Sequence, residues 1–388
     1  MKRYVLCVIF ALIFMCLFVC ENDYIVYAND INNDINAKSY IVIDNNNKIL
    51  CGDNYENKRE VASICKLMTT LIALEKISAG DMKLDDKIYV SNYAASMEGS
   101  QAFLDGGKEY TVEDILKSII IASANDSAVA LAESIGGSEK AFVSMMNTRA
   151  KELGMYNTIY ANATGLSTVE QYSTAYDTAI LLKELDKYDI YHKYSTVWLD
   201  YITHSSGRKT ELVNTNRNIK YYEYCEMGKT GFTDEAGYWL ASKNTKVDLA
   251  IYVVVLGASN SAGRFTDSMK LCDYTFANYK VEKVLGGGDM IPNTIKVTRG
   301  ARDTIKLALS EDCLLTKKVG GADTYFIKYV LPDSIEAEIR EGDVIGQVLV
   351  IENSIVIREV DIIANETIAR ETYGDIVGKV IEKFGFIS

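Results

Sequence analysis

The sequence predicts an α+β fold in two parts, with a mixed helix and strand domain over residues 29–285 and a small all-β domain over residues 291–365. Length is the first observation. The chain has 388 residues, and the roughly 360 that remain after an N-terminal leader favour two domains. The second is a change of pattern at Gly286-Gly287-Gly288, since helical spacing dominates before it and period-two alternation after it.

The N-terminus predicts a signal peptide over residues 1–28. Lys2 and Arg3 precede an apolar run that begins at Tyr4, and Val26-Tyr27-Ala28 offers small residues at the positions a signal peptidase reads. A retained membrane anchor is the alternative, although the run is shorter than the roughly 20 residues that span a bilayer. Either segment places the folded part outside the cytoplasm, secreted, in the cell wall or at the outer face of the membrane.

Helical patterns follow the leader, framed by strands. Thr111 stands as an N-terminal cap before an apolar helix, and Ser138 is predicted to begin a second helix that ends at Gly154. Strand-like runs frame these helices at residues 40–44, 238–242 and 249–256. The last two runs are expected to join across the polar segment Lys243-Asn244-Thr245-Lys246. A helical region inserted between strands of an antiparallel sheet is an α+β arrangement.

Period-two alternation predicts the second domain. Glycines at Gly300, Gly320-Gly321 and Gly342 mark its turns. The alternating apolar residues are Ile295, Val297, Ile305, Leu307, Leu309, Ile335, Ala337 and Ile339.

Residues 366–388 are predicted to end in an amphipathic helix. Ile376, Val377, Val380, Ile381 and Phe384 recur at helical spacing, opposite charged residues. Such a stripe suits peripheral contact with a membrane surface, and packing on its own domain is the open alternative.

Composition excludes several classes of protein. The net charge is −12 with no basic stripe, which argues against nucleic acid as a partner. Five cysteines remain after the leader at irregular spacings and without Cys-x-x-Cys, so neither a disulfide framework nor a zinc site is indicated, and no metal or other cofactor is expected. His192 and His204 are expected at the surface, which leaves no histidine for a Ser-His-Asp triad.

Ser63-Ile64-Cys65-Lys66 is the candidate nucleophile motif. Apolar residues continue it as a helix, and residues three apart on a helix share a face, which sets the Lys66 amine beside the Ser63 hydroxyl. The same spacing at Ser206 and Lys209 lies in a polar stretch without helical pattern and is a decoy.

Two further motifs follow in order. Ser123-Ala124-Asn125 interrupts two helical segments, where its polar side chains could cap a helix or act on a substrate. Lys229-Thr230-Gly231 fits an edge strand, where glycine lets a bound peptide approach the backbone and lysine attracts a carboxylate. The three motifs together are the signature of enzymes that react with penicillin through a serine.

The sequence resembles the low-molecular-mass penicillin-binding proteins that act as serine-type D-alanyl-D-alanine carboxypeptidases. The resemblance covers residues 38–280 closely, and the later β segment, with Gly342-Asp343-Val344-Ile345-Gly346, less specifically. Beyond the motifs, the segments that carry it are Leu153-Gly154-Met155, Asn162-Ala163-Thr164-Gly165-Leu166, residues 172–177 and Asn214-Thr215-Asn216. It implies a penicillin-binding, β-lactamase-like transpeptidase domain followed by the family's β domain. Cys65 and Ala124 depart from the threonine and glycine that are usual in the family.

The resemblance also implies roles for the site residues. Ser63 is the nucleophile, Lys66 its general base and Ser123 a proton relay. Asn125 holds the substrate backbone, Lys229, Thr230 and Gly231 bind its carboxylate end, and the backbone N–H groups of Ser63 and Phe232 form the oxyanion hole. Burial and the charge of Lys229 are both expected to lower the pKa of Lys66. The implied substrate is a peptidoglycan stem peptide ending in D-Ala-D-Ala, with β-lactams as covalent inhibitors and cell wall biogenesis as the process.

Two alternative functions would use the same residues to acylate Ser63. A β-lactamase needs an extra glutamate for deacylation, and Glu211 lies too close to Lys229 in sequence for that loop. A non-hydrolytic β-lactam-sensing or wall-binding module would acylate and stay acylated.

Overall fold

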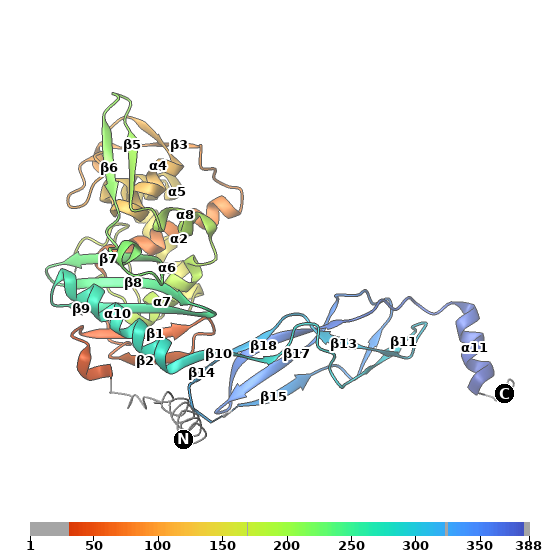
Figure 1. Cartoon of the computed structure of the whole chain (residues 1–388). Coiled ribbons are helices and arrows are strands. Elements are labelled where there is room, and N and C mark those ends of the chain that lie inside the picture. The colour runs from red at the N-terminus through yellow and green to blue at the C-terminus, as the bar shows by residue number, and fades with distance from the viewer. Residues whose placement is uncertain (1–30, 169, 323–324, 384–388) are drawn as a thin grey trace, which may run out of the picture.

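The computed structural model describes residues 31–168, 170–322 and 325–383, so the predicted leader lies outside the described residues. A first domain of helices around a sheet continues into an elongated β domain (Figure 1). The mixed first domain and the all-β second domain agree with the predicted α+β class.

A five-stranded sheet forms the centre of the first domain, in the order β2-β1-β9-β8-β7 with every pair antiparallel. The strands are β1 (Ser39–Asp44), β2 (Ile49–Asp53), β7 (Cys225–Thr233), β8 (Gly237–Lys246) and β9 (Leu249–Ala258). Strand β7 carries the third motif at the open edge of this sheet, as predicted.

Both faces of the sheet are buried. All six residues of β1 are buried, and its alternate side chains belong to two separate cores. Tyr40 and Val42 pack with helix α10 (Ser261–Asn278), whereas Ile41 and Ile43 face the helices on the other side. The sheet is therefore a central layer covered by helices on both faces.

The inserted helical region connects β2 to β7. Its elements are η2 (Ala62–Cys65), α2 (Lys66–Ser78), β3 (Lys87–Tyr89), α3 (Asn92–Ala95), β4 (Glu109–Thr111), α4 (Val112–Ala122), α5 (Asn125–Gly136), α6 (Glu139–Glu152), α7 (Ala175–Leu185), α8 (Asp189–Ser195), β5 (Leu199–Thr203), β6 (Lys209–Val213) and α9 (Asn218–Tyr221). The short helix η1 (Ile31–Asp34) precedes the sheet. The predicted caps are confirmed, because the hydroxyls of Thr111 and Ser138 accept backbone N–H bonds at the starts of α4 and α6. Gly154 follows α6 with a φ of +77°.

The turn between β8 and β9 lies later than predicted. Residues 243–246 belong to β8, and the chain reverses at Val247 and Asp248. Lys243 is stabilised inside the strand because its ammonium forms ion pairs with Asp186 and Glu226 at 2.9 Å each. The prediction of a turn at residues 243–246, which rested on their polar side chains, is therefore wrong.

The β domain consists of three small sheets around one core. They are β10-β14, β12-β11-β16 and β13-β18-β17-β15, with β11 and β16 parallel. The strands are β10 (Tyr279–Leu285), β11 (Ile295–Thr298), β12 (Thr304–Ile305), β13 (Leu307–Leu309), β14 (Cys313–Lys318), β15 (Tyr325–Val330), β16 (Ser334–Glu336), β17 (Val344–Glu352) and β18 (Ile355–Ala364). Strand β10 pairs with β14, so residues 279–285 are hydrogen-bonded to the second domain although they precede the triple glycine.

Helix α11 (Tyr373–Lys383) follows the β domain and lies at the end of the molecule farthest from the first domain (Figure 1). Ile376 and Val377 on this helix are exposed. Among the described residues, no helix combines the length and the apolar character that crossing a membrane requires.

Candidate active site

Ser63 lies on the short 3₁₀ turn η2, immediately before helix α2 and against strand β7. Ser63 was expected to share a helix with Lys66, whereas Lys66 is the first residue of α2 and Ser63 lies in the turn before it. The turn still brings the two side chains together, and the Lys66 Nζ donates a hydrogen bond to the Ser63 Oγ at 2.9 Å. A nucleophile and its candidate base are therefore in direct contact.

Lys66 is fully buried and also donates to the carbonyl oxygen of Thr164 at 2.7 Å. Burial lowers the pKa of Lys66 to about 7. Lys66 and Lys229 repel each other when both are charged, and this repulsion also lowers the pKa of Lys229. The predicted effect of Lys229 on the pKa of Lys66 stays a prediction. A substantial fraction of Lys66 is therefore neutral near pH 7, as a general base requires.

The loop Asn162–Gly165 forms the wall behind Lys66. The Asn162 Oδ1 accepts the backbone N–H groups of Thr164 at 3.1 Å and Gly165 at 2.7 Å, which fixes the Thr164 carbonyl that holds Lys66. Gly165 has a φ of +83°, and a Cβ there would lie 1.7 Å from the Ala62 carbonyl oxygen. The segment Asn162–Gly165 was identified from the family resemblance alone, and no role was predicted for it.

Ser123 and Lys229 form a second hydrogen-bonded pair of candidate site residues. The Lys229 Nζ donates to the Ser123 Oγ at 2.7 Å and to the Thr230 carbonyl at 3.0 Å. Ser123 has a φ of +63°, a conformation that costs a non-glycine residue energy and that is common at active sites. Burial, followed by the charges of Lys66 and Arg264, lowers the pKa of Lys229 well below its usual value.

Asn125 is anchored by a loop that precedes it in sequence. Its side-chain Nδ2 donates to the Glu98 carbonyl, and its backbone N–H donates to the Ser100 carbonyl at 2.7 Å. The Asn125 Oδ1 is buried and has no hydrogen-bond partner among the described residues. A buried, unpaired amide oxygen is available to accept an N–H group of a ligand.

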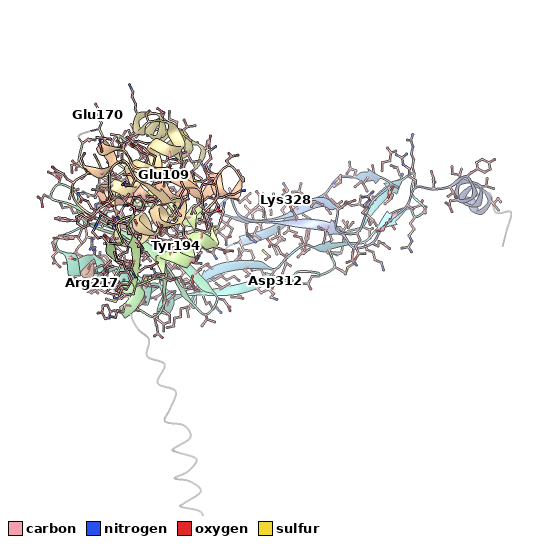
Figure 2. The ribbon with its side chains drawn as sticks, turned by 90° about the horizontal axis from the view of Figure 1, so that it is seen from above. Glu109, Glu170, Tyr194, Arg217, Asp312 and Lys328 are labelled. Atoms are coloured by element: carbon pink, nitrogen blue, oxygen red, sulfur yellow. The ribbon has the colours of Figure 1, made fainter. Side chains whose placement is uncertain are left out.

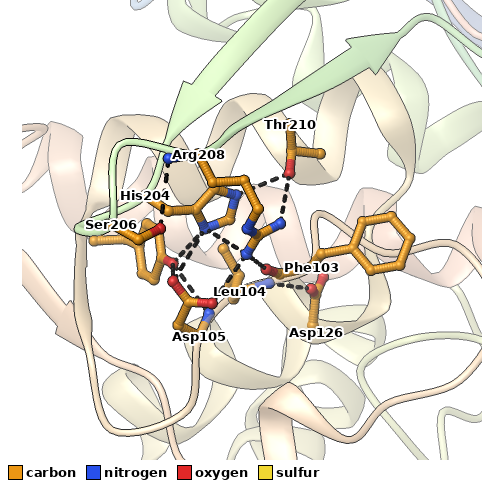
Figure 3. Close-up of polar contacts among 9 residues, drawn as sticks. Phe103, Leu104, Asp105, Asp126, His204, Ser206, Arg208 and Thr210 are labelled. Carbon is orange, nitrogen blue, oxygen red and sulfur yellow. Dashed lines mark hydrogen bonds and ion pairs between the residues drawn. The ribbon is translucent and has the colours of Figure 1, made fainter.

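Asp126 binds the same loop from the next position. Its carboxylate accepts the backbone N–H groups of Ala102 and Leu104 at 3.0 Å each. Arg208, from the tip of the β5–β6 hairpin, donates to the Phe103 carbonyl at 2.6 Å and to the Asp105 carboxylate at 2.9 Å (Figure 3). The β5–β6 hairpin therefore holds the loop of residues 98–105, and this loop in turn holds Asn125.

His204 is buried, so its expected surface position is wrong. Its Nδ1 lies 2.7 Å from the Tyr110 hydroxyl, and its Nε2 lies 2.8 Å from the Thr210 Oγ1 (Figure 3). Burial lowers the pKa of His204. His192 is half-buried and pairs with Asp186 at 2.8 Å. Within the described residues, the hydrogen bonds of both histidines go to groups other than Ser63.

Strand β7 presents the third motif to the nucleophile turn. A Cβ on Gly231 would lie 3.2 Å from Ala62 and Ile64, so this glycine lets the strand approach the nucleophile turn. The predicted approach of a bound peptide to Gly231 stays a prediction. The Thr230 Oγ1 donates to the Thr215 Oγ1 at 2.7 Å. The Phe232 ring is exposed and stacked on Tyr238.

Arg264 on α10 is a candidate site residue that the sequence analysis missed. It is 9% exposed, and its Nη1 donates to the Gly231 carbonyl at 3.0 Å. Burial lowers the pKa of Arg264 to about 10, so it stays charged at neutral pH, and its Nε has no partner in the described part of the chain. Its sequence surroundings carry no motif, and only the fold brings it to β7.

The residues of the rival interpretations lie elsewhere. Glu211 is exposed on β6, where its carboxylate contacts the Tyr201 hydroxyl at 3.5 Å. The decoy Ser206 lies in the hairpin turn before β6. Glu211 therefore gives no support for a deacylating glutamate.

Two family models match the chain. Residues 26–260 match the D-alanyl-D-alanine carboxypeptidase family, peptidase S11, and residues 279–370 match the C-terminal domain of penicillin-binding protein 5. D-alanyl-D-alanine carboxypeptidase DacF of Bacillus subtilis is 38% identical over 351 residues, covering 87% of this chain and 90% of the relative. DacA of Escherichia coli is 30% identical, covering 81% and 79%.

Solved structures of penicillin-binding proteins are also similar to this chain. The crystal structure of PBP3 of Streptococcus pneumoniae, described as a peptidoglycan synthesis regulatory factor, is similar with a TM-score of 0.77 at 27% identity, covering 86% of this chain and 99% of that one. Penicillin-binding protein 5 of Haemophilus influenzae gives 0.71 at 27% identity, covering 87% and 98%. With its paired serines and lysines in contact, the chain belongs to the D-alanyl-D-alanine carboxypeptidase family of low-molecular-mass penicillin-binding proteins.

Proposed function

We propose that this chain removes the terminal D-alanine from peptidoglycan stem peptides through an acyl-enzyme on Ser63. The observation that carries the proposal is the hydrogen bond between Lys66 and Ser63, made by a buried lysine whose pKa is about 7. A neutral amine in this position can accept the serine proton as the hydroxyl attacks the penultimate D-alanine carbonyl. β-Lactams would acylate the same oxygen and act as inhibitors.

Ser123 would deliver the proton to the departing D-alanine, because its hydroxyl is held by the Lys229 ammonium of the third motif. The backbone N–H groups of Ser63 and Phe232 would stabilise the oxyanion. Asn125 would accept an N–H of the substrate backbone through its unpaired Oδ1. Water would then hydrolyse the ester and release the shortened peptide.

The terminal carboxylate would bind among Lys229, Thr230 and Arg264. Burial and the neighbouring charges lower the pKa of Lys229, and an arriving carboxylate would raise this pKa and favour the charged ammonium. Arg264 offers an unpaired guanidinium N–H next to the same strand. A free carboxylate thereby distinguishes a chain end from an internal peptide bond.

The reaction is tested with the purified mature chain, a peptide ending in D-Ala-D-Ala, and penicillin. We expect release of D-alanine, a long-lived penicillin adduct on the Ser63 peptide by mass spectrometry, and neither in Ser63→Ala. Rapid turnover of penicillin would instead show a β-lactamase, and an adduct without peptide cleavage would show a sensor.

Lys229→Ala tests the carboxylate assignment. We expect kcat/KM for the peptide to fall on the order of 100-fold or more, because the variant loses a preorganised charge at the reacting centre. The unfolding midpoint should change little by comparison. Lys246→Ala, at the end of the neighbouring strand β8, is the matched control and should keep full activity. Retained activity in Lys229→Ala would refute the assignment.

The location of the enzyme is also part of the proposal. Cleavage of residues 1–28 would deliver the catalytic domain, residues 29–285, to the outer face of the cytoplasmic membrane or to the wall. The β domain of residues 291–365 would act as a spacer, and the exposed apolar side chains of α11 would contact the membrane surface.

A further inference from the structure

A cavity of about 560 Å³ opens beside the third motif. Thr215 and Arg264 form its inner wall, and both contact the catalytic strand. The Thr215 Oγ1 accepts a hydrogen bond from Thr230, and the Arg264 Nη1 donates to the Gly231 carbonyl. The cavity therefore adjoins the place where the terminal carboxylate is proposed to bind.

Two guanidinium groups give this cavity a positive charge. Arg217 and Arg264 both line it, and within the residues that the structure describes neither forms an ion pair with a carboxylate. Arg264 is 9% exposed, and its Nη1 and Nη2 bond to carbonyl and hydroxyl oxygens. Its Nε has no hydrogen-bond partner among the described residues. In a chain of net charge −12, a buried guanidinium without a carboxylate partner indicates a site for an anionic ligand.

The outer wall of the cavity is aromatic. Trp198 and Tyr221 line it with their rings edge to face, 6.3 Å between centroids. The backbone N–H of Asn214 donates to the Trp198 carbonyl at 2.9 Å, which fixes the tryptophan backbone. Lys220 lies over both rings, 4.9 Å from that of Trp198 and 5.6 Å from that of Tyr221. Arg217 lies on the side of the first domain away from the β domain (Figure 2).

A D-alanine side chain leaves this space almost empty. A methyl group is about the size of a water molecule, whose share of liquid volume is roughly 30 Å³. A carboxylate beside Arg264 together with an apolar or aromatic side chain against Trp198 and Tyr221 matches both walls, since such a side chain gains from burial and ring contact.

We infer that this cavity is a subsite for the side chain of the departing residue, and that the enzyme also releases terminal D-residues with apolar or aromatic side chains larger than that of alanine. The inference rests on the proposed carboxypeptidase reaction. The bond changes are those proposed for release of D-alanine. The Ser63 Oγ–acyl bond forms, the amide C–N bond to the last residue breaks, and the nitrogen of that residue takes the proton relayed by Ser123. Water then cleaves the ester.

The test compares peptides that differ only in the last residue, which is D-alanine, D-methionine, D-phenylalanine or D-lysine, using the full mature chain. We expect kcat/KM for the D-methionine and D-phenylalanine peptides to be at least one tenth of that for D-alanine. Values below one tenth, with D-alanine still released, would overturn the inference alone. Absence of release from all four peptides would overturn the proposed function.

Charge provides a second comparison, because methionine and lysine side chains are similar in length. Two guanidiniums without carboxylate partners disfavour a cationic side chain. We expect kcat/KM for the D-lysine peptide to be at least tenfold below that for D-methionine. A smaller difference would refute a role for the arginines in selecting the departing residue.

Variants locate the subsite. Trp198→Ala and Tyr221→Ala should each lower the ratio of kcat/KM for D-phenylalanine over D-alanine about tenfold. Tyr221 is 67% exposed, so its variant is expected to fold even if Trp198→Ala does not. Tyr201→Ala removes an exposed ring of the neighbouring strand β5 that does not line the cavity, and should leave the ratio unchanged. An unchanged ratio in Tyr221→Ala would overturn the assignment.

Discussion

Lys66 and Lys229 are buried in the candidate active site, and each donates to one serine, Ser63 and Ser123 respectively. Two ammonium groups in a buried site repel each other, and burial already disfavours the charged form of each. Both effects favour a neutral amine at Lys66, the proposed base, while binding of an anion would favour the charged form of Lys229.

The pKa of Lys66, about 7, predicts the pH dependence of acylation. Only the neutral amine accepts the Ser63 proton, so the rate of penicillin acylation should rise with pH and level off above pH 8. The rate at pH 6 should be about one tenth of the plateau, since roughly a tenth of a group with pKa 7 is neutral there. Stopped-flow acylation from pH 5 to 9 measures this profile. A flat profile would contradict the assignment of Lys66 as the base.

Gly165 and Gly207 form a matched pair at the same φ of +83°. An added Cβ meets the Ala62 carbonyl oxygen at 1.7 Å on Gly165 and nothing within 4 Å on Gly207. Gly207→Ala should cost about 1 kcal/mol in unfolding free energy, from backbone strain alone. Gly165→Ala should cost at least about 2 kcal/mol and slow acylation severely, because Ala62 must move next to Ser63.

Urea unfolding and penicillin acylation of both variants measure the two effects. Equal losses of stability and activity in the two variants would show that the loop Asn162–Gly165 does not position the nucleophile turn.

At the scale of elements, the β5–β6 hairpin holds the loop before the second motif. Arg208→Ala removes the bonds to Phe103 and Asp105, so the loop should loosen around Asp126. We expect faster hydrogen exchange at the amides of Ala102 and Leu104 and a KM raised severalfold. Lys209→Ala, an exposed neighbour, is the control and should change neither. Unchanged exchange at these two amides would show that the hairpin does not restrain the loop.

The sequence was informative about elements with strong local signals. The caps at Thr111 and Ser138 and the contact of Lys66 with Ser63 follow from short-range spacing. The edge position of β7 was predicted from its motif. The prediction of a turn at residues 243–246 was wrong, because the carboxylates of Asp186 and Glu226 pair with Lys243 inside strand β8.

The remaining parts of the candidate site depend on contacts between distant segments. His204 is buried only because the hairpin packs on the segment of Tyr110, 94 residues earlier in the chain. Arg264 reaches Gly231 from a helix that begins 30 residues later, a distance fixed by the order of the sheet strands. No local pattern encodes either contact.

At the scale of the whole molecule, the catalytic domain and α11 lie at opposite ends of an elongated chain (Figure 1). Lys48, in the turn before β2, forms an ion pair of 3.1 Å with Glu352 at the end of β17, which joins the two domains near β10. Such a pair at a half-exposed position contributes about 1 kcal/mol or less.

The exposed apolar residues of α11 predict binding to lipid vesicles. Ile376→Asp with Val377→Asp should reduce cosedimentation of the mature chain with vesicles severalfold, because a charged side chain resists burial in the interface. Hydrolysis of a soluble peptide should stay within twofold of the wild type. Val319→Asp, an exposed valine of the β domain, is the control. Equal vesicle binding by all three proteins would show that α11 is not the contact.

The five cysteines of the described chain are free, and each has a pKa raised by burial, to about 12 for Cys65 beside the nucleophile. Because the thiolate is the reactive species, these thiols should resist alkylation and oxidation in an oxidising compartment. A cysteine introduced on the surface would then be the reactive thiol of the mature chain. A spectroscopic label could thus be attached next to Tyr221, and the arrival and release of each departing residue followed in real time.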